Sequence, residues 1–193
     1  MDRLPEVRLT ETDFGELVIL VNELQNDAHH YCLRLDDTDH PDRCRRQFAR
    51  TFFAAIEGTV WTFKRLALSR HYSGAVALSA GEIAALREEA FRIERSGGVG
   101  VEDMRTPFLP NFLFAFRVVA ATYEFEYNIP TGDAEYERFQ ACARIRDRLT
   151  HPKRLIDLQI TDSETDALKV AYKWFWEHAI TLMNRLPASQ GGN

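Results

Sequence analysis

The sequence predicts an all-α fold: an up-and-down bundle of five to six helices that forms one domain over residues 1–193. Apolar residues recur at spacings of three and four along most of the chain, whereas the alternation typical of a half-buried strand is nearly absent. Two segments, Ser79–Glu82 and Thr161–Glu164, fit the capping box that begins a helix. A chain of 193 residues with 45% hydrophobic content can bury one sizeable core without a second domain.

The first third of the chain predicts two long helices. The first begins near Thr10 or Thr12 and continues to about Leu35. The second begins at Asp39-His40-Pro41, because proline is favoured in the first helical turn, and extends to about Ser69. The short link between them predicts an antiparallel pair. The apolar positions that define the two buried faces are Phe14, Leu17, Val21, Leu24, Ala28, Tyr31 and Leu35, and Phe48, Phe52, Ala55, Ile56, Thr59, Phe63 and Leu66.

Residues 70–105 separate the two long helices from the rest of the predicted bundle. The capping box at Ser79-Ala-Gly-Glu82 predicts a helix over about 80–95, and the glycine-rich segment 96–100 follows it as a loop. Any β-structure is expected only within residues 70–105, as a short hairpin. The glycines follow a helix and not a strand, so they do not fit a phosphate-binding loop.

Three further helices complete the predicted bundle. They cover residues 110–127, 133–150 and, after the second capping box, 161–186. Pro152 favours a helix end after Thr150, because a residue before proline is pushed out of the helical region. Residues 188–193 are predicted to be a disordered tail.

The charged residues are segregated along the chain. The formal net charge of -5 argues against a protein that coats nucleic acid in bulk. Residues 124–137 nevertheless carry five acids and no base, whereas residues 144–154 carry five Lys or Arg residues and one acid. The sequence therefore predicts a local basic patch on an acidic protein.

The three cysteines, Cys32, Cys44 and Cys142, are far apart and form no C-x-x-C pair. They favour reduced, buried thiols in a cytoplasmic protein, and no metal site or cofactor is expected. The N-terminus lacks the apolar core of a signal peptide, and acidic residues or glycine interrupt the longest apolar runs. Neither export nor a membrane span is expected.

An arginine interrupts the apolar face of the helix predicted over residues 133–150. At 100° per residue the apolar side chains fill one arc, and Arg146 falls near its centre. Asp147 and His151 form an i, i+4 pair on the flank of that arc. A desolvated guanidinium is costly unless it is paired, so Arg146 implies a partner or a ligand. The arc consists of Tyr136, Phe139, Cys142, Ala143, Ile145 and Leu149.

The motif Arg146-Asp147-x-x-x-His151, in a late helix of a small helical bundle, resembles the signature of the HEPN superfamily, in which an arginine, a polar residue and a histidine share this spacing. The resemblance implies a helical bundle, with residues 70–105 as an insertion, that forms a homodimer and brings two copies of the motif together. In many members it implies a metal-independent endoribonuclease. Other members have lost catalysis and act as binding modules.

The resemblance also implies roles for the residues around the motif. His151 would take the proton of a ribose 2′-hydroxyl, and Arg146 would stabilise the charge on the phosphorane. Asp147 would orient the ring or stabilise the imidazolium. The phosphodiester backbone of RNA would be held by Arg148, Lys153 and Arg154. The implied product is a 2′,3′-cyclic phosphate, in a toxin or defence setting with a protein antitoxin or regulator.

Two alternatives remain open from the residues alone. In the first alternative both residues are structural: Arg146 pairs with an acid on another helix, such as Glu57, and His151 caps the helix C-terminus. Alternatively, the protein is a non-catalytic dimeric module that binds a protein or a nucleotide. In family members whose motif ends in a tyrosine, a nucleotidyltransferase-type antitoxin modifies that tyrosine; Lys153 stands in its place here, which argues against that kind of partner.

Several aromatic residues are weaker candidates for function. In the last predicted helix, aromatic side chains at helical spacing fit core and interface packing better than a platform for stacked bases. Trp61 falls off the core arc of its helix and is a candidate dimer contact. The aromatic residues of the last helix are Tyr172, Trp174, Phe175 and Trp176.

Overall fold

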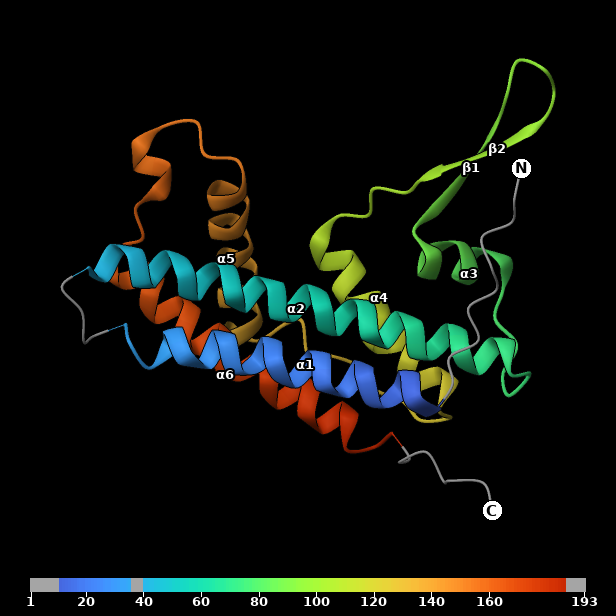
Figure 1. Ribbon diagram of the computed structural model, residues 1–193, viewed down its shortest axis with the longest axis horizontal. Helices are drawn as coiled ribbons and strands as arrows, with labels where there is room; N and C mark the ends of the chain where they lie inside the picture. The colour runs from blue at the N-terminus through green and yellow to red at the C-terminus, as the bar shows by residue number, and fades with distance from the viewer. Residues whose placement is uncertain (1–10, 36–39, 187–193) are drawn as a thin grey trace.

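A computed structural model describes residues 11–35 and 40–186 of the chain. Within these residues the fold is mostly helical, with one two-stranded sheet (Figure 1). The predicted tail over residues 188–193 lies outside the described residues. In chain order the elements are α1 (Glu11–Cys32), α2 (Pro41–Tyr72), α3 (Ala80–Arg87), β1 (Glu89–Ile93), β2 (Val99–Asp103), α4 (Phe108–Thr122), α5 (Ala134–Thr150), a 3-10 helix η1 (Leu155–Leu158) and α6 (Asp162–Met183).

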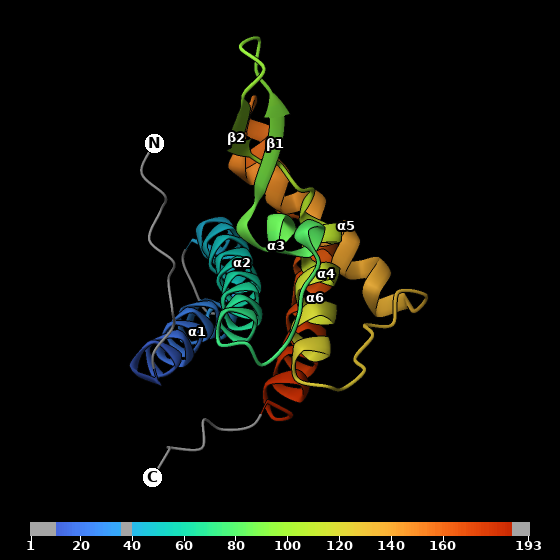
Figure 2. The ribbon, with the colours of Figure 1, turned by 90° about the vertical axis from the view of Figure 1, so that its right-hand side faces the viewer.

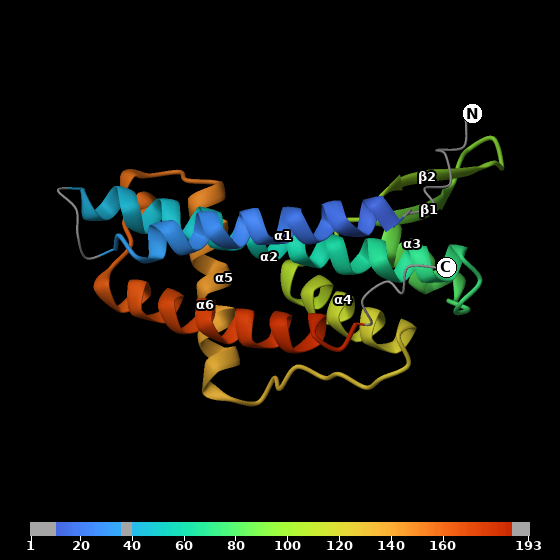
Figure 3. The same ribbon diagram turned by 60° about the horizontal axis from the view of Figure 1, so that its bottom comes forward.

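The long helix α2 organises the fold. It lies beside α1 as the predicted antiparallel pair, and α4, α5 and α6 pack against its other sides (Figures 1 and 3). Phenylalanine rings from α2, α4, α5 and α6 form the centre of the core. The rings of Phe63 and Phe116 pack edge to face, with their centroids 4.9 Å apart. The fully buried rings of this core are Phe48, Phe52, Phe63, Phe112, Phe116, Phe139 and Phe175.

One helix departs from the predicted up-and-down arrangement. Helix α5 crosses α2 and α6 instead of running alongside them (Figure 3). Its apolar arc still faces the core, since Phe139 and Cys142 are fully buried. The crossing leaves the C-terminal end of α5, together with η1, projecting beyond α2 (Figure 1). Periodicity defines which face of a helix is buried but not the direction in which the helix crosses its neighbours.

The prediction of a helix over residues 80–95 is wrong in its second half. The capping box is confirmed, because the Ser79 side chain accepts a hydrogen bond from the Glu82 amide and the Glu82 carboxylate accepts one from the Ser79 amide. The helix ends at Arg87, however, because Glu88 adopts a left-handed conformation with φ of 57°. Residues 89–93 then pair with residues 99–103 in an antiparallel hairpin. The short hairpin expected in the insertion is therefore confirmed.

The helix predicted over residues 110–127 lies earlier in the chain, at residues 108–122. Glu124 takes a left-handed conformation with φ of 64°, which ends the helical path. The following segment places the Tyr127 ring against the core, and its hydroxyl lies 2.7 Å from His178 Nδ1 on α6. Burial of aromatic side chains therefore outweighs helix propensity at this boundary.

The starts of α2, α5 and α6 agree with the sequence, whereas α1, α2 and α6 each end three residues from the predicted position. Asp133 caps α5, the capping box at Thr161 and Glu164 begins α6, and α2 starts with Pro41 in its first turn. In the described part of the chain, no helix combines the length and apolar character that a membrane span requires.

Candidate functional site

Arg146 lies at the contact between α5 and α2, where its side chain is paired on every side. Its Nε donates to Glu57 Oε1 at 3.0 Å, and Nη2 donates to the same oxygen. Nη1 donates to Asp147 Oδ1 at 2.9 Å. The guanidinium also lies over the Phe108 ring, 5.4 Å from its centroid. Arg146 therefore sits at the edge of the core, with 29% of its side chain exposed, and is not fully desolvated.

The charges around Arg146 keep its guanidinium ionised. Partial burial lowers its pKa, but the hydrogen bonds and charges of Glu57 and Asp147 outweigh that effect, so the pKa of Arg146 is raised above its ordinary value. The alternative in which Glu57 is the partner of Arg146 thus describes the geometry correctly. The side chains of Glu57 and Asp147 are themselves 48% and 67% exposed, so this is a surface network that an incoming anion can reach.

Arg146 and Glu57 line a small groove between α2 and α5. Its volume is about 170 Å³, and its lining combines apolar side chains with charged groups from both helices. Arg50 adds a second guanidinium, about two helical turns before Glu57 on α2. The lining consists of Ala49, Arg50, Phe53, Ala54, Glu57, Arg146, Leu149 and Thr150. Arg50 was not predicted as a site residue, although its i, i+7 spacing to Glu57 places both side chains on one helix face.

His151 lies at the end of α5 and directly follows Thr150, which lines the groove, but is not itself among the lining residues. It is the C-cap residue, with φ of -127° and ψ of 58°, and its backbone N–H donates to Asp147 O at 3.1 Å. The side chain is exposed, and within the described residues its ring makes no hydrogen bond. His151 thus combines a helix-capping position with an imidazole that is free to meet a ligand.

The expected contact between Asp147 and the His151 ring is absent from the described residues. The Asp147 carboxylate accepts a hydrogen bond from Arg146, and its link to His151 runs through the backbone. The reason is the helix end: His151 has left the helical conformation, so its side chain no longer follows the i, i+4 direction. Asp147 therefore holds Arg146 in this structure and not the imidazole.

The three expected RNA-binding cations differ in their surroundings. Arg148 is tied to α6, because its guanidinium donates to Glu164 at 3.0 and 3.1 Å and to Gln159 O at 2.7 Å. Burial raises the pKa of Glu164, but hydrogen bonds from Arg148 and Thr161 outweigh it and the pKa lies below its ordinary value. Arg148 is thus a structural cation that joins two helices.

Lys153 and Arg154 are exposed on the segment between α5 and η1. The Asp157 carboxylate accepts hydrogen bonds from both of their backbone amides, at 2.9 and 2.8 Å, which fixes the turn. The Arg154 guanidinium lies 3.6 Å from Asp157 and is 77% exposed. These two side chains remain available to a ligand, unlike Arg148.

The other aromatic candidates divide into core and surface residues. Trp174, Phe175 and Trp176 are buried, which confirms their packing role. Trp61 is exposed, with the Arg65 guanidinium 5.7 Å from its ring centroid. A second groove of about 520 Å³ lies between α1 and α6; it contains no residue of the motif, and its walls include His29 and Tyr172.

In the described part of the chain, no three His, Cys, Asp or Glu side chains gather as a metal site requires. Comparisons with models of protein families, with curated proteins and with solved structures gave no match to this chain.

Proposed function

We propose that this protein is a metal-independent endoribonuclease that works as a homodimer and leaves a 2′,3′-cyclic phosphate. The observation that carries the proposal is the placement of two groups at one helix end. Arg146 presents a charged guanidinium to a groove on α5 and α2, and the exposed imidazole of His151 lies five residues later with no hydrogen-bond partner in the described structure. Arg50 lines the same groove, and Lys153 and Arg154 are exposed on the segment that follows His151.

The proposed reaction uses the two groups in different ways. His151 accepts the proton of the ribose 2′-hydroxyl as O2′ forms a bond to phosphorus, and the bond from phosphorus to O5′ breaks. The proton returns to O5′ from the imidazolium, so the products are a 2′,3′-cyclic phosphate and a 5′-hydroxyl. Negative charge grows on the non-bridging oxygens as the bond forms, and Arg146 supplies a permanent positive charge there. Asp147 positions that guanidinium through its hydrogen bond.

Binding of a phosphate requires an exchange of partners at Arg146. In this structure Glu57 occupies Nε and Nη2, the two donors that would grip a phosphate in a bidentate manner. Because Glu57 is half exposed, it can turn into solvent when an anion replaces it. Glu57 therefore acts as a competitor of the substrate in this proposal, and its neutralisation should strengthen RNA binding.

The same ion pair favours a second candidate function, a non-catalytic dimeric module that binds a protein or a nucleotide. In that case the ion pair between Glu57 and Arg146 persists when the ligand binds, and the groove recognises its ligand through Arg50 and apolar contacts. A setting as a toxin or defence protein, with an antitoxin or regulator as partner, belongs to the first proposal and rests on the motif.

Incubation of the purified protein with several RNAs in EDTA tests the proposal. We expect cleavage by the wild type and at least about a hundredfold slower cleavage by His151→Ala, because loss of a general base typically costs about 10² to 10⁴ in rate. His29→Ala is the matched control, since His29 is also exposed but lies on α1 and lines the other groove. Absence of cleavage across the RNAs, or equal loss in both variants, would favour the binding module.

Lys153→Ala and Arg154→Ala should each weaken cleavage partially. Their charges act on phosphates through solvent, so the loss should shrink as salt rises. Arg148→Ala should instead lower stability, because it leaves Glu164 without its partner. Rates measured at two salt concentrations, together with melting curves, separate these effects.

A further inference from the structure

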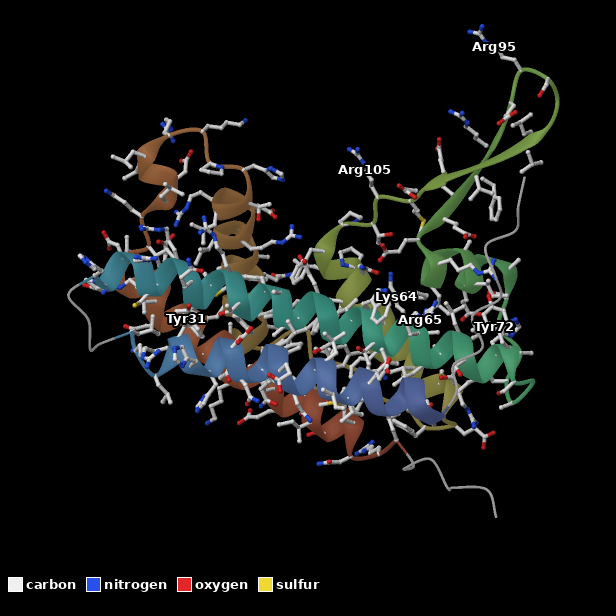
Figure 4. All side chains as sticks on the ribbon, viewed as in Figure 1. Tyr31, Lys64, Arg65, Tyr72, Arg95 and Arg105 are labelled. Atoms are coloured by element: carbon white, nitrogen blue, oxygen red, sulfur yellow. The ribbon has the colours of Figure 1, made fainter. Side chains whose placement is uncertain are left out.

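The β-hairpin leaves a large apolar face without a covering partner. In the hairpin register Phe91 pairs with Val101 and Ile93 with Val99, so these four side chains lie on one face. Their exposed fractions range from 49% to 83%. A two-stranded hairpin is marginally stable on its own in water, and each of its strands has one edge without a β-partner. The hairpin nevertheless projects away from the helices, with Arg95 pointing outward at its tip (Figures 1 and 4).

The base of the hairpin is held firmly, so this projection has a defined direction. The Lys64 ammonium, 2% exposed on α2, donates to Glu88 at 2.8 Å and to Ala85 O at 3.3 Å. Glu88 is the left-handed residue that turns α3 into β1. This ion pair between a buried ammonium and a half-exposed carboxylate fixes the point at which the hairpin leaves the body.

A second projection carries complementary groups. The end of α5 and η1 rise from the same side of α2 as the hairpin, in both Figure 1 and Figure 2. At η1, Leu155 and Ile156 are 79% and 53% exposed. Lys153 and Arg154 immediately precede them and are exposed as well. An apolar pair bordered by two cations therefore forms the tip of this arm.

The charges of the two projections are opposite. At the base of the apolar hairpin face, Glu89 pairs with Asp103, so two carboxylates share that face with the four apolar side chains. Residues 89–103 carry four acids against two bases. At the tip of the arm Lys153 and Arg154 stand against Asp157, since Arg146 and Arg148 are already paired with Glu57 and Glu164. Attraction between such patches orients two surfaces as they meet, while apolar burial supplies the affinity. Repulsion from the acids disfavours RNA or an anionic membrane as the occupant of the hairpin.

We infer that the hairpin of one copy packs on the η1 arm of a second copy. A two-fold axis perpendicular to α2, placed between the two projections, carries each hairpin onto the partner's arm, so the contact forms twice in one closed dimer. The inference rests on the dimer of the proposed function and names the surfaces that build it. In this dimer the partner's hairpin lies against η1, which follows His151 in the chain.

Measurement of the mass in solution tests this interface. Wild-type protein at micromolar concentration should have about twice the chain mass of 22.3 kDa in sedimentation or light scattering. The double variant Phe91→Ser with Ile93→Ser should fall to the chain mass, and so should Leu155→Ser with Ile156→Ser. The control Arg92→Ser changes the opposite face of the hairpin and should remain a dimer. A monomeric wild type, or dimeric double variants, would overturn the inference.

Cross-linking between two chains tests the pairing itself. Differently tagged chains, one with Ile93→Cys and the other with Leu155→Cys, should form a disulfide between them on mild oxidation. Arg92→Cys replaces Ile93→Cys as the control and should give at least about tenfold less product, because it faces away from the partner. Lack of a cross-link with Ile93→Cys in a dimeric sample would overturn the inference.

These results separate the inference from the proposed function. RNA cleavage is measured on the same samples. A cross-linked dimer that cleaves no RNA supports the interface and contradicts the endoribonuclease, whereas a monomer that cleaves RNA contradicts the interface alone.

Discussion

Replacement of Arg146 by methionine distinguishes a catalytic role from a structural one. Methionine keeps the apolar stem but removes the hydrogen bonds to Glu57 and Asp147 and the contact with the Phe108 ring. Ion pairs as exposed as these contribute about 0.2–1 kcal/mol each, and the cation–π contact adds about 0.5–1 kcal/mol. We therefore expect a loss of about 1–3 kcal/mol, or about 2–12 °C in melting temperature for a chain of this size. A fully buried pair would cost about 3–5 kcal/mol.

The matched variant is Glu57→Gln, which removes the competing charge and leaves the guanidinium in place. If Arg146 contacts phosphate in the transition state, Arg146→Met should slow single-turnover cleavage by about 10² or more. Glu57→Gln should bind RNA at least as tightly as the wild type, because phosphate no longer has to replace a carboxylate. Urea denaturation and single-turnover rates on the same preparations give both quantities.

Two results would refute this reasoning. One is a loss of more than about 3 kcal/mol in Arg146→Met with the rate per folded molecule unchanged, which would make the arginine structural. The other is a loss of cleavage in Glu57→Gln as large as that in Arg146→Met, which would mean that the ion pair itself, and not a free guanidinium, is required.

Three further predictions concern stability. Burial lowers the pKa of His178 from 6.5, an effect that nearby acids only partly offset. Because the unfolded chain binds a proton at higher pH than the folded one, the free energy of unfolding should fall as the pH drops below about 6.5. Urea denaturation of His178→Gln should show a flatter dependence on pH. Removal of the Glu88 charge should cost more than removal of the Lys64 charge, because Glu88→Gln leaves a buried ammonium without its carboxylate whereas Lys64→Met leaves an exposed carboxylate; chemical denaturation of the two variants compares them. Thr161→Ala should cost about 1 kcal/mol by loss of the α6 cap, and Thr161→Ser should cost little in the same assay.

Periodicity and capping predict most of the helices of this fold. The two capping boxes and Pro41 mark helix starts that the structure confirms, because each depends on contacts within one helical turn. The boundaries near Glu88 and Glu124 could not be predicted, since both residues adopt positive φ where tertiary contacts favour it. Lys64 supplies such a contact at Glu88, from a distant part of the chain.

The site was predicted in part for the same reason. The apolar arc of α5 identifies Arg146 as an arginine that needs a partner, and Glu57 on α2 is that partner. The arc does not reveal that the backbone leaves the helical conformation at His151. The Asp147 carboxylate therefore accepts a hydrogen bond from Arg146 and not from the His151 ring. Nor does it reveal that Arg148 is held by Glu164, because that contact depends on how α6 packs on α5.

The most direct test of the proposed chemistry is cleavage of an RNA that carries a single 2′-deoxyribonucleotide at the mapped cleavage position. The mechanism needs the 2′-hydroxyl as nucleophile and His151 as its base, so the wild type should cut the all-ribose RNA in EDTA to a 2′,3′-cyclic phosphate and a 5′-hydroxyl. It should leave the deoxy-substituted bond intact. Cleavage of both substrates at equal rates, or products that end in a 3′-hydroxyl, would contradict the role assigned to His151.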